Sequence, residues 1–305
     1  MAGQATSTTM RSVGNAEDFR KLAYNIAYDD TPLYSMLKKE GCINDKFEWI
    51  EDTLAAPAAN AVAEAATITA SEVTVPVRYY NYCQQMEKTF VISDKQEAIQ
   101  QKQGGSFSAG KQLKNRTIEL KRDANYALWN NTTRSAGSTA AATYTGGLPY
   151  WVGTATFTAG LSVDGGSAAI TESGFLSAMQ KIYETHVPGN MVVGMSPTNK
   201  MRIDAFTGGA VKQAQQTDKK VTNTIKVYES SFGSFMLFME RAATLANTDV
   251  YVLDLDLLKI RELIPIEHKE LGYTKHAEEH MVQTCFGLEC GSPYAHCRIR
   301  NLSST

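Results

Sequence analysis

The chain has 305 residues, of which 43% are hydrophobic and 20% charged, and its 30 basic and 32 acidic side chains give a formal net charge of -2. This length can bury a large core in one or two domains, and the charge balance argues against a dedicated nucleic-acid binder, which usually has a strongly basic face or tail. No stretch of 18 apolar residues is present and the N-terminus is polar, so neither a transmembrane helix nor a signal peptide is expected. Without export, the five cysteines are expected to be reduced thiols.

The first 45 residues are expected to form an extended terminal segment with two short helices. Asn15 is the expected N-cap of the first helix, which ends before Pro32 because a residue that precedes proline disfavours the helical region. A second helical stretch of one or two turns is expected from Pro32 to Glu40, ending at Gly41.

A long hairpin is expected over residues 46 to about 92. Apolar and polar side chains alternate in Phe47–Ile50 and again in Val73–Tyr79, which is typical of strands. Between these two runs the chain has nine alanines from Ala55 to Ala70, and it has no basic residue between Lys46 and Arg78. Two isolated strands with so little apolar bulk are marginal in water, so we expect this hairpin to lie on a neighbouring copy of the chain.

The longest helical pattern covers Ser106–Asn131. Leu113, Leu120 and Ala124 belong to a set of residues that recurs every three or four positions, which is typical of a helix with one apolar face. A helix of this length would be about 40 Å long at about 1.5 Å per residue, which is long for one globular domain.

The remainder of the chain has an α/β pattern that ends mostly in strands. The expected elements are a helix capped by Thr171 that runs to about His186, a buried strand at 190–194, a helix opened by Ser196-Pro197 that runs to Phe206, a hairpin within 221–239, a strand at 249–253, and further strands within 257–264 and 281–302.

In this order and at this spacing, several short motifs resemble the major capsid proteins of tailed bacteriophages, whose fold is of the Hong Kong 97 type. The likeness extends over nearly the whole chain. The motifs are Asp30-Thr31-Pro32-Leu33 with Met36-Leu37, Glu48-Trp49 followed by Asp52-Thr53-Leu54-Ala55-Ala56 and Asn60-Ala61, Glu87-Lys88-Thr89-Phe90-Val91-Ile92-Ser93, Glu119-Leu120-Lys121-Arg122-Asp123, Gly146-Gly147-Leu148, and Asp218-Lys219-Lys220 with Val252-Leu253-Asp254.

The resemblance implies an α+β capsid fold made of the parts that are named in this family. The expected parts are an N-terminal arm at 1–45, an E-loop hairpin and its base at 46–92, a P-domain with a long spine helix at 93–139, an α/β A-domain at 140–247, and strands at 248–305 that return to the P-domain before the C-terminus. The polar loop Thr207–Lys220 is the expected tip of the A-domain at the capsomer axis.

The resemblance also implies a structural protein and not an enzyme, with no cofactor and no metal. As a major head protein, the chain would self-assemble into hexamers and pentamers of an icosahedral head that encloses double-stranded DNA, which it would contact without sequence specificity. The expected partners are other copies of the chain, a separate scaffolding protein, a portal and a decoration protein, with no membrane. The protein would be located in the virion after assembly in the host cytoplasm.

In this family the E-loop lies across the neighbouring subunit, often over its spine helix. Here the hairpin is acidic and the expected spine helix is basic, and opposite charges across such a contact would set its register. The alternative is that these side chains are solvated surface charges. The candidate contact residues are Glu48, Glu51, Asp52, Glu64 and Glu72 on the hairpin, and Lys111, Lys114, Arg116, Lys121 and Arg122 on the helix.

Two features depart from well-known members of the family. Some shells are cross-linked through a lysine of the E-loop, and this hairpin has no lysine between residues 47 and 77, so a non-covalent shell is expected. Some members also have a long N-terminal scaffold segment, and only about 15 residues precede the first expected helix here. We therefore expect a separate scaffolding protein.

Two other functions are open at this point. One is the shell of a cellular nanocompartment of the same fold, which would enclose a cargo enzyme. The other is a zinc hydrolase, because His276, Glu279 and His280 match the H-x-x-E-H pattern of some zinc peptidases. A structural zinc site is a related alternative, although the spacing of the nearby residues is not that of a standard zinc knuckle; these residues are Cys285, Cys290, His296 and Cys297.

Overall fold

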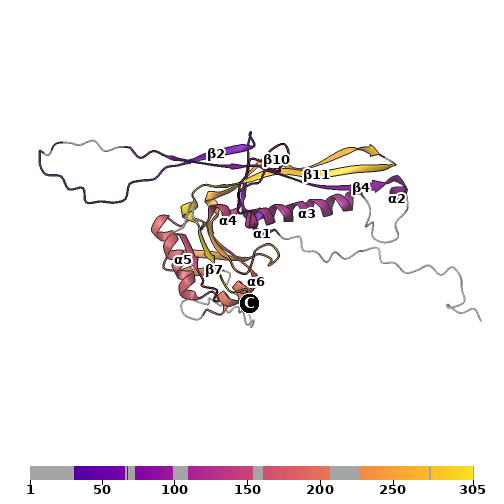
Figure 1. The fold of residues 1–305 in the computed structure, drawn as a ribbon. Coiled ribbons are helices and arrows are strands. Elements are labelled where there is room, and N and C mark those ends of the chain that lie inside the picture. The colour runs from indigo at the N-terminus through magenta and orange to yellow at the C-terminus, as the bar shows by residue number, and fades with distance from the viewer. Residues whose placement is uncertain are drawn as a thin grey trace, which may run out of the picture.

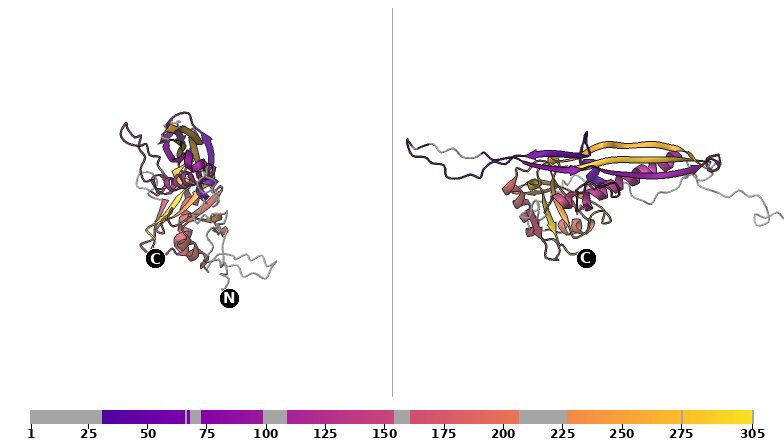
Figure 2. Two further views of the ribbon diagram at one scale, coloured as in Figure 1. Left: turned by 90° about the vertical axis from the view of Figure 1, so that its right-hand side faces the viewer. Right: turned by 45° about the horizontal axis from the view of Figure 1, so that its top comes forward.

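The structure is a computed structural model, and it describes residues 31–65, 67, 73–98, 109–153, 161–206, 227–274 and 276–304. A long upper layer of strands has a projecting hairpin at one end and a long helix beneath the other, and an α/β unit lies below the middle of this layer (Figure 1). The two further views show that the upper layer is narrow when it is seen end-on (Figure 2). The helix expected near Asn15 lies outside the described residues.

The upper layer is a four-stranded sheet in the order β1-β10-β11-β4. Its centre is the long antiparallel hairpin of β10 (Leu258–Thr274) and β11 (Ala277–Cys290), whose register shifts at several bulges. β4 (Gln84–Ser93) pairs antiparallel with β11, and β1 (Lys38–Gly41) pairs parallel with β10. One face of this sheet packs on a helix, which accounts for the alternation of buried and exposed side chains along β4.

The long helix that was expected as the spine helix is α3 (Ala109–Asn130), which has 22 residues and is therefore about 33 Å long. Its C-terminal half is the better buried part, because Leu120, Ala124 and Leu128 are inaccessible to solvent and share one face. Trp129 extends this contact toward the α/β unit, where its ring lies 5.3 Å from that of Tyr251. The sequence predicted this helix, and the first three residues of the predicted range lie outside the described chain.

The α/β unit is built on a six-stranded sheet in the order β5-β12-β9-β6-β8-β7. Its strands are β5 (Ser162–Asp164), β6 (Met191–Met195), β7 (Val227–Ser230), β8 (Gly233–Met239), β9 (Val250–Asp254) and β12 (Cys297–Arg300). Every residue of β6 and β9 is buried, because these two strands lie in the middle of the sheet. Their short, continuous apolar sequences are typical of buried strands.

Two helices of this unit begin where their capping residues predicted. The Thr171 side chain accepts a hydrogen bond from the backbone N–H of Gly174, at 3.2 Å, and caps α5 (Glu172–Thr185). Ser196 similarly accepts from Asn199 at the start of α6 (Pro197–Asp204), which has proline at its first position.

The projecting hairpin, residues 46–82, has paired strands only at its base. β2 (Lys46–Glu51) pairs antiparallel with β3 (Val77–Tyr82), and the alternation predicted for β2 is confirmed by its burial pattern. The strand predicted to start at Val73 begins at Val77 instead.

The structure corrects two further details of the expected architecture. The stretch from Pro32 to Glu40 is helical only in α1 (Pro32–Met36), because the residues after it pair with β10 as β1. The strands expected to return to the P-domain divide between the sheets: β10 and β11 enter the four-stranded sheet, whereas β9 and β12 enter the six-stranded one. Tertiary pairing therefore overrides the local pattern at both places.

The shorter elements complete the described chain. They are α2 (Asp94–Ala98), α4 (Leu148–Trp151), and the 3-10 turns η2 (Leu255–Leu257) and η3 (Pro293–Ala295). Of the helices that the structure describes, none has both the length and the apolar character that a bilayer crossing needs.

Candidate assembly surface

Aromatic side chains attach the base of the projecting hairpin to the body of the molecule. On β2, the rings of Phe47 and Trp49 stack at 5.9 Å. The Trp49 ring lies 5.2 Å from that of Trp151 in α4, and Tyr79 of β3 approaches the same tryptophan at 6.1 Å. At Gly287 of β11, an added Cβ would lie 2.5 Å from the ring of Phe47, so only glycine fits beneath this ring.

Asn81 of β3 is the polar anchor of the same base, and its side chain is completely buried. Its amide nitrogen donates to Thr145 Oγ1 at 3.1 Å, to the Gly146 carbonyl at 3.0 Å and to the Leu288 carbonyl at 2.7 Å. Its amide oxygen accepts from the Gly146 N–H at 2.9 Å. One side chain therefore joins the projecting hairpin, the segment before α4 and strand β11.

Beyond this base, the described residues of the projecting hairpin are exposed, including its apolar ones. The exposed fraction is 97% for Leu54, 89% for Val73 and 81% for Val75. The hairpin extends away from the body at one end of the molecule, and α3 runs toward the other end (Figure 1). The residues that the structure describes therefore offer the outer part of this hairpin no surface to lie on.

Two of the five acidic candidates are engaged within their own chain. Glu48 forms ion pairs with Lys46 at 2.5 Å and Arg78 at 3.3 Å, and the hydrogen bond from Lys46 lowers the pKa of its carboxyl group. Glu51 accepts a hydrogen bond from the Ser292 hydroxyl at 2.5 Å. Asp52 and Glu64 are exposed, and Glu72 lies outside the described residues.

The five basic candidates on α3 are not equivalent. Lys114 and Lys121 are exposed and lie two helical turns apart, so they share one face. Arg116 is paired with Glu119 of the same helix at 2.6 Å. Lys111 and Arg122 are half-buried. An ion pair of 2.6 Å between Lys88 and Asp123, which no pattern in the sequence predicted, holds β4 to this helix.

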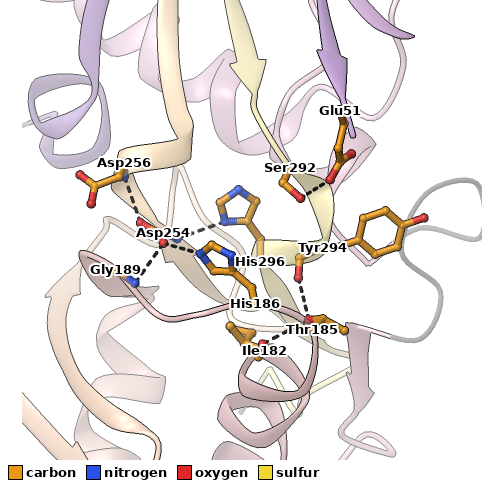
Figure 3. A network of polar contacts seen from close by, with 10 residues as sticks. All are labelled: Glu51, Ile182, Thr185, His186, Gly189, Asp254, Asp256, Ser292, Tyr294 and His296. Atoms are coloured by element: carbon orange, nitrogen blue, oxygen red, sulfur yellow. Dashed lines mark hydrogen bonds and ion pairs between the residues drawn. The ribbon is translucent and has the colours of Figure 1, made fainter. Parts of the chain in front are cut away.

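A buried polar network joins the end of α5 to the sheet of the α/β unit (Figure 3). Asp254, at the end of β9, is 1% exposed, and its carboxylate lies 3.0 Å from His186 Nε2 and accepts from the Gly189 N–H at 3.2 Å. The Asp254 N–H donates to His296 Nδ1 at 3.1 Å. Complete burial lowers the pKa of His296 to about 3, so this imidazole is neutral and acts as an acceptor.

A second set of contacts links this region to the projecting hairpin. Figure 3 shows Glu51, at the end of β2, beside Ser292, which directly precedes η3. The next turn is attached to α5, because Thr185 Oγ1 donates to the Tyr294 carbonyl at 2.9 Å. The sequence analysis missed this arrangement. The base of the hairpin and the α/β unit are therefore joined by directed hydrogen bonds as well as by apolar packing.

The H-x-x-E-H motif does not form the helical zinc site that its spacing suggested. His276 is exposed in the turn between β10 and β11, and Ala277–Cys290 is a strand. Successive side chains of a strand point to opposite faces, so Glu279 and His280 do not converge. His280 is buried and stacks on Phe90 at 4.8 Å. Within the described ranges, no group of three or more His, Cys, Asp or Glu side chains could hold a metal ion.

Comparisons with known proteins agree with this architecture. The family model of the SU10 major capsid protein matches residues 5–303. Among solved structures, the chain is similar to one from Gordonia phage Cozz (TM-score 0.64, 12% identity, 99% of this chain and 100% of that chain covered). It is also similar to the capsid of the cyanophage P-SCSP1u (TM-score 0.62, 11% identity, 99% and 100% covered).

A third similar structure is the holo-SrpI encapsulin complex from Synechococcus elongatus PCC 7942 (TM-score 0.60, 10% identity, 95% of this chain and 94% of that chain covered). At these identities the likenesses to solved structures show the fold alone. A search of curated proteins found no match.

Proposed function

Because the chain belongs to the SU10 major capsid protein family, we propose that it builds its shell by laying the projecting hairpin of each copy over the spine helix of a neighbouring copy. The chain is a bacteriophage major capsid protein and a component of the virion, and its fold is of the Hong Kong 97 type. The resemblance found in the sequence is thereby confirmed.

The observation that carries this proposal is the exposure of the projecting hairpin. Leu54, Val73 and Val75 are almost fully exposed, and apolar side chains that water surrounds in the single chain gain free energy when another surface covers them. The hairpin also points away from the spine helix of its own chain (Figure 1). A contact between two different surfaces of identical subunits is heterologous, and such contacts close into rings when the rotation between subunits permits.

The charges of the two surfaces support the same pairing. On the hairpin, Asp52 and Glu64 are exposed acids, and the chain has no basic residue between Lys46 and Arg78. On α3, Lys114 and Lys121 present two exposed ammonium groups on one face. Complementary charges of this kind fix the register of a contact and disfavour wrong pairings more than they add affinity. Glu72 is assigned to the same acidic set from the sequence.

The proposal extends to the parts and partners of the shell. The segments 46–92, 93–139 and 140–247 act as E-loop with its base, P-domain and A-domain, with the N-terminal arm before them and 248–305 after them. Hexamers and pentamers assemble in the host cytoplasm around a separate scaffolding protein, join a portal and enclose double-stranded DNA. The role is structural, and no catalytic step is assigned to the chain.

A nanocompartment shell is the second candidate, and the likeness to the SrpI encapsulin complex favours it at the level of the fold. The two candidates differ in what the shell encloses. A phage head contains double-stranded DNA, whereas a nanocompartment contains a protein cargo. Nuclease-resistant nucleic acid in purified particles would support the phage head, and a stoichiometric cargo protein without nucleic acid would support the nanocompartment.

Charge reversal tests the proposed contact. In a variant with Glu64→Lys and Glu72→Lys, like charges face the spine helix, and we expect the assembled fraction in sedimentation to fall about tenfold while the circular dichroism of the unassembled chain is unchanged. The matched control combines these changes with Lys114→Glu and Lys121→Glu, which restores opposite charges and should recover assembly. Wild-type yields of shells from the first variant would contradict the proposed contact.

A further inference from the structure

Three cysteine side chains meet where the projecting hairpin leaves the body. Cys42 follows β1, Cys83 joins β3 to β4, and Cys285 lies on β11. The sulfur atoms of Cys42 and Cys83 are 3.4 Å apart, and Cys285 belongs to the same buried cluster under Phe47. Cys42 and Cys83 therefore stand at the two ends of the hairpin, one before it and one after it.

The backbone holds these thiols in place. The Cys42 N–H donates to the Glu262 carbonyl of β10 at 3.0 Å, which continues the pairing of β1. The Cys83 N–H donates to the Asp45 carbonyl at 2.8 Å, which closes the base of the hairpin. Because both residues are fixed by strand hydrogen bonds, the approach of their sulfur atoms follows from the fold.

The three thiols differ in accessibility and in acidity. Cys42 is half-buried, so a small reagent can reach it, whereas Cys83 and Cys285 are buried. A hydrogen bond from Cys83 lowers the pKa of the Cys285 thiol, and sharing this proton, together with burial, raises the pKa of Cys83. Cys42 is therefore the thiol that a reagent in solution meets first.

The two remaining cysteines have none of these properties. Cys290 and Cys297 are fully buried in other parts of the core, and neither belongs to this cluster. Burial raises the pKa of Cys297 to about 12 and that of Cys290 well above its ordinary value, and it also raises the pKa of Cys42. What sets Cys290 and Cys297 apart is therefore that a reagent in solution cannot reach them. They serve as internal controls in the same chain.

We propose that Cys42 and Cys83 form a disulfide that joins the two ends of the projecting hairpin once the protein meets a small-molecule disulfide such as oxidised glutathione. Cys42 attacks the reagent, so that its thiol becomes a mixed disulfide and one glutathione leaves as a thiol. Cys83 then attacks the sulfur of Cys42, and the proton that Cys83 loses goes to the departing sulfur, so that the second glutathione also leaves as a thiol. In total, two protein thiols are oxidised and one glutathione disulfide is reduced to two thiols.

The bond would close a loop that contains the whole projecting hairpin. In the reducing cytosol of a host the thiols would remain free, and the bond would form after the particle reaches an oxidising medium. The hairpin would then be held at its base by a covalent link in addition to Asn81 and the aromatic contacts. A role for this disulfide in stabilising the shell rests on the proposed function, whereas the formation of the disulfide in the single chain does not.

Peptide mapping of the full-length chain tests the proposal. Unassembled protein is incubated with oxidised glutathione, alkylated under denaturing conditions and digested with trypsin. We expect residues 40–46 and 79–88 to be recovered as one disulfide-linked pair, and the number of free thiols to fall from five to three. The Cys285→Ser variant should form the same link, and Cys83→Ser should stop at a glutathione adduct on Cys42.

Other products would overturn the inference. Five unmodified thiols after oxidation, a glutathione adduct that persists on Cys42 of the wild type, or a link between Cys83 and Cys285 would each exclude the proposed bond. A parallel assembly assay under reducing conditions reports on the proposed function alone. If the Cys42–Cys83 link forms but the protein does not assemble, the proposed function is wrong. If the protein assembles but the link does not form, the proposed disulfide is wrong.

Discussion

Removing the Asn81 side chain should loosen the base of the projecting hairpin. Asn81→Ala deletes three donated hydrogen bonds and two accepted ones, from the N–H groups of Gly146 and of the half-buried Tyr82. Two of the former partners keep another bond, since Thr145 Oγ1 still accepts from the Leu288 N–H and the Gly146 carbonyl still accepts from the Trp151 indole. The Gly146 N–H and the Leu288 carbonyl lose this side chain as their partner in the buried interior.

The expected magnitude follows from these two buried groups. A buried backbone group that loses its hydrogen bond costs about 1–3 kcal/mol, so the variant should lose about 2–6 kcal/mol of unfolding free energy if no water replaces the side chain. Asn60→Ala makes the same chemical change at an exposed position of the same hairpin, and it should cost less than about 0.5 kcal/mol.

Urea unfolding of the unassembled chain, followed by circular dichroism, measures this difference directly. Amide hydrogen exchange would locate the loss, because β2 and β3 should exchange faster in Asn81→Ala while the six-stranded sheet is unchanged. Equal stabilities of Asn81→Ala and Asn60→Ala would refute the view that one buried amide anchors the hairpin.

Three further predictions follow from single features. Replacing the N-cap of α5 in Thr171→Ala should lower the unfolding free energy by about 1 kcal/mol in urea titration, and unchanged stability would argue against the cap. Burial lowers the pKa of His296 from its ordinary value of 6.5 to about 3. Between these two pH values the unfolded chain binds a proton at His296 and the folded chain does not, so the unfolding free energy decreases as the pH falls from 6.5 toward 3. Between pH 7 and 5 the wild type should lose about 2 kcal/mol more than His296→Asn, and equal losses would contradict the neutral buried imidazole. Because the hairpin has no lysine between residues 47 and 77, denatured and reduced particles should run as monomers on a gel, and a ladder of covalent oligomers would disprove this.

Local signals in the sequence predicted the elements whose stability is local. Thr171 and Ser196 cap the helices that they were expected to cap, and the spine helix ends at Asn130, one residue before its predicted end. These predictions succeeded because helix ends and amphipathic faces depend on residues a few positions apart.

Features that depend on distant partners could not be read in the same way. Lys38–Gly41 follows a helical turn directly, and it becomes a strand only because β10, more than 200 residues later, pairs with it. The strand pattern of Gln84–Ser93 is the same whether it pairs within the hairpin or with β11. The contact between His186 and Asp254 joins residues that are 68 positions apart, so no local pattern in the sequence predicts it.

The candidate contact charges were predicted from composition, and the structure separates them by environment. Glu48 and Arg116 have partners in their own chain, whereas Glu64 and Lys121 are exposed. Sequence alone could not make this distinction, because an ion pair depends on side-chain geometry. The exposed members are therefore the better choice for testing the contact between copies.

The most direct test of the account is a reconstruction of the assembled particle by electron microscopy, after isolation by sedimentation. The account predicts a closed shell in which residues 52–76 of each subunit lie on α3 of a neighbouring subunit, with Asp52 and Glu64 facing Lys114 and Lys121. A shell in which this segment folds back on its own subunit, or touches no neighbour, would contradict the central claim.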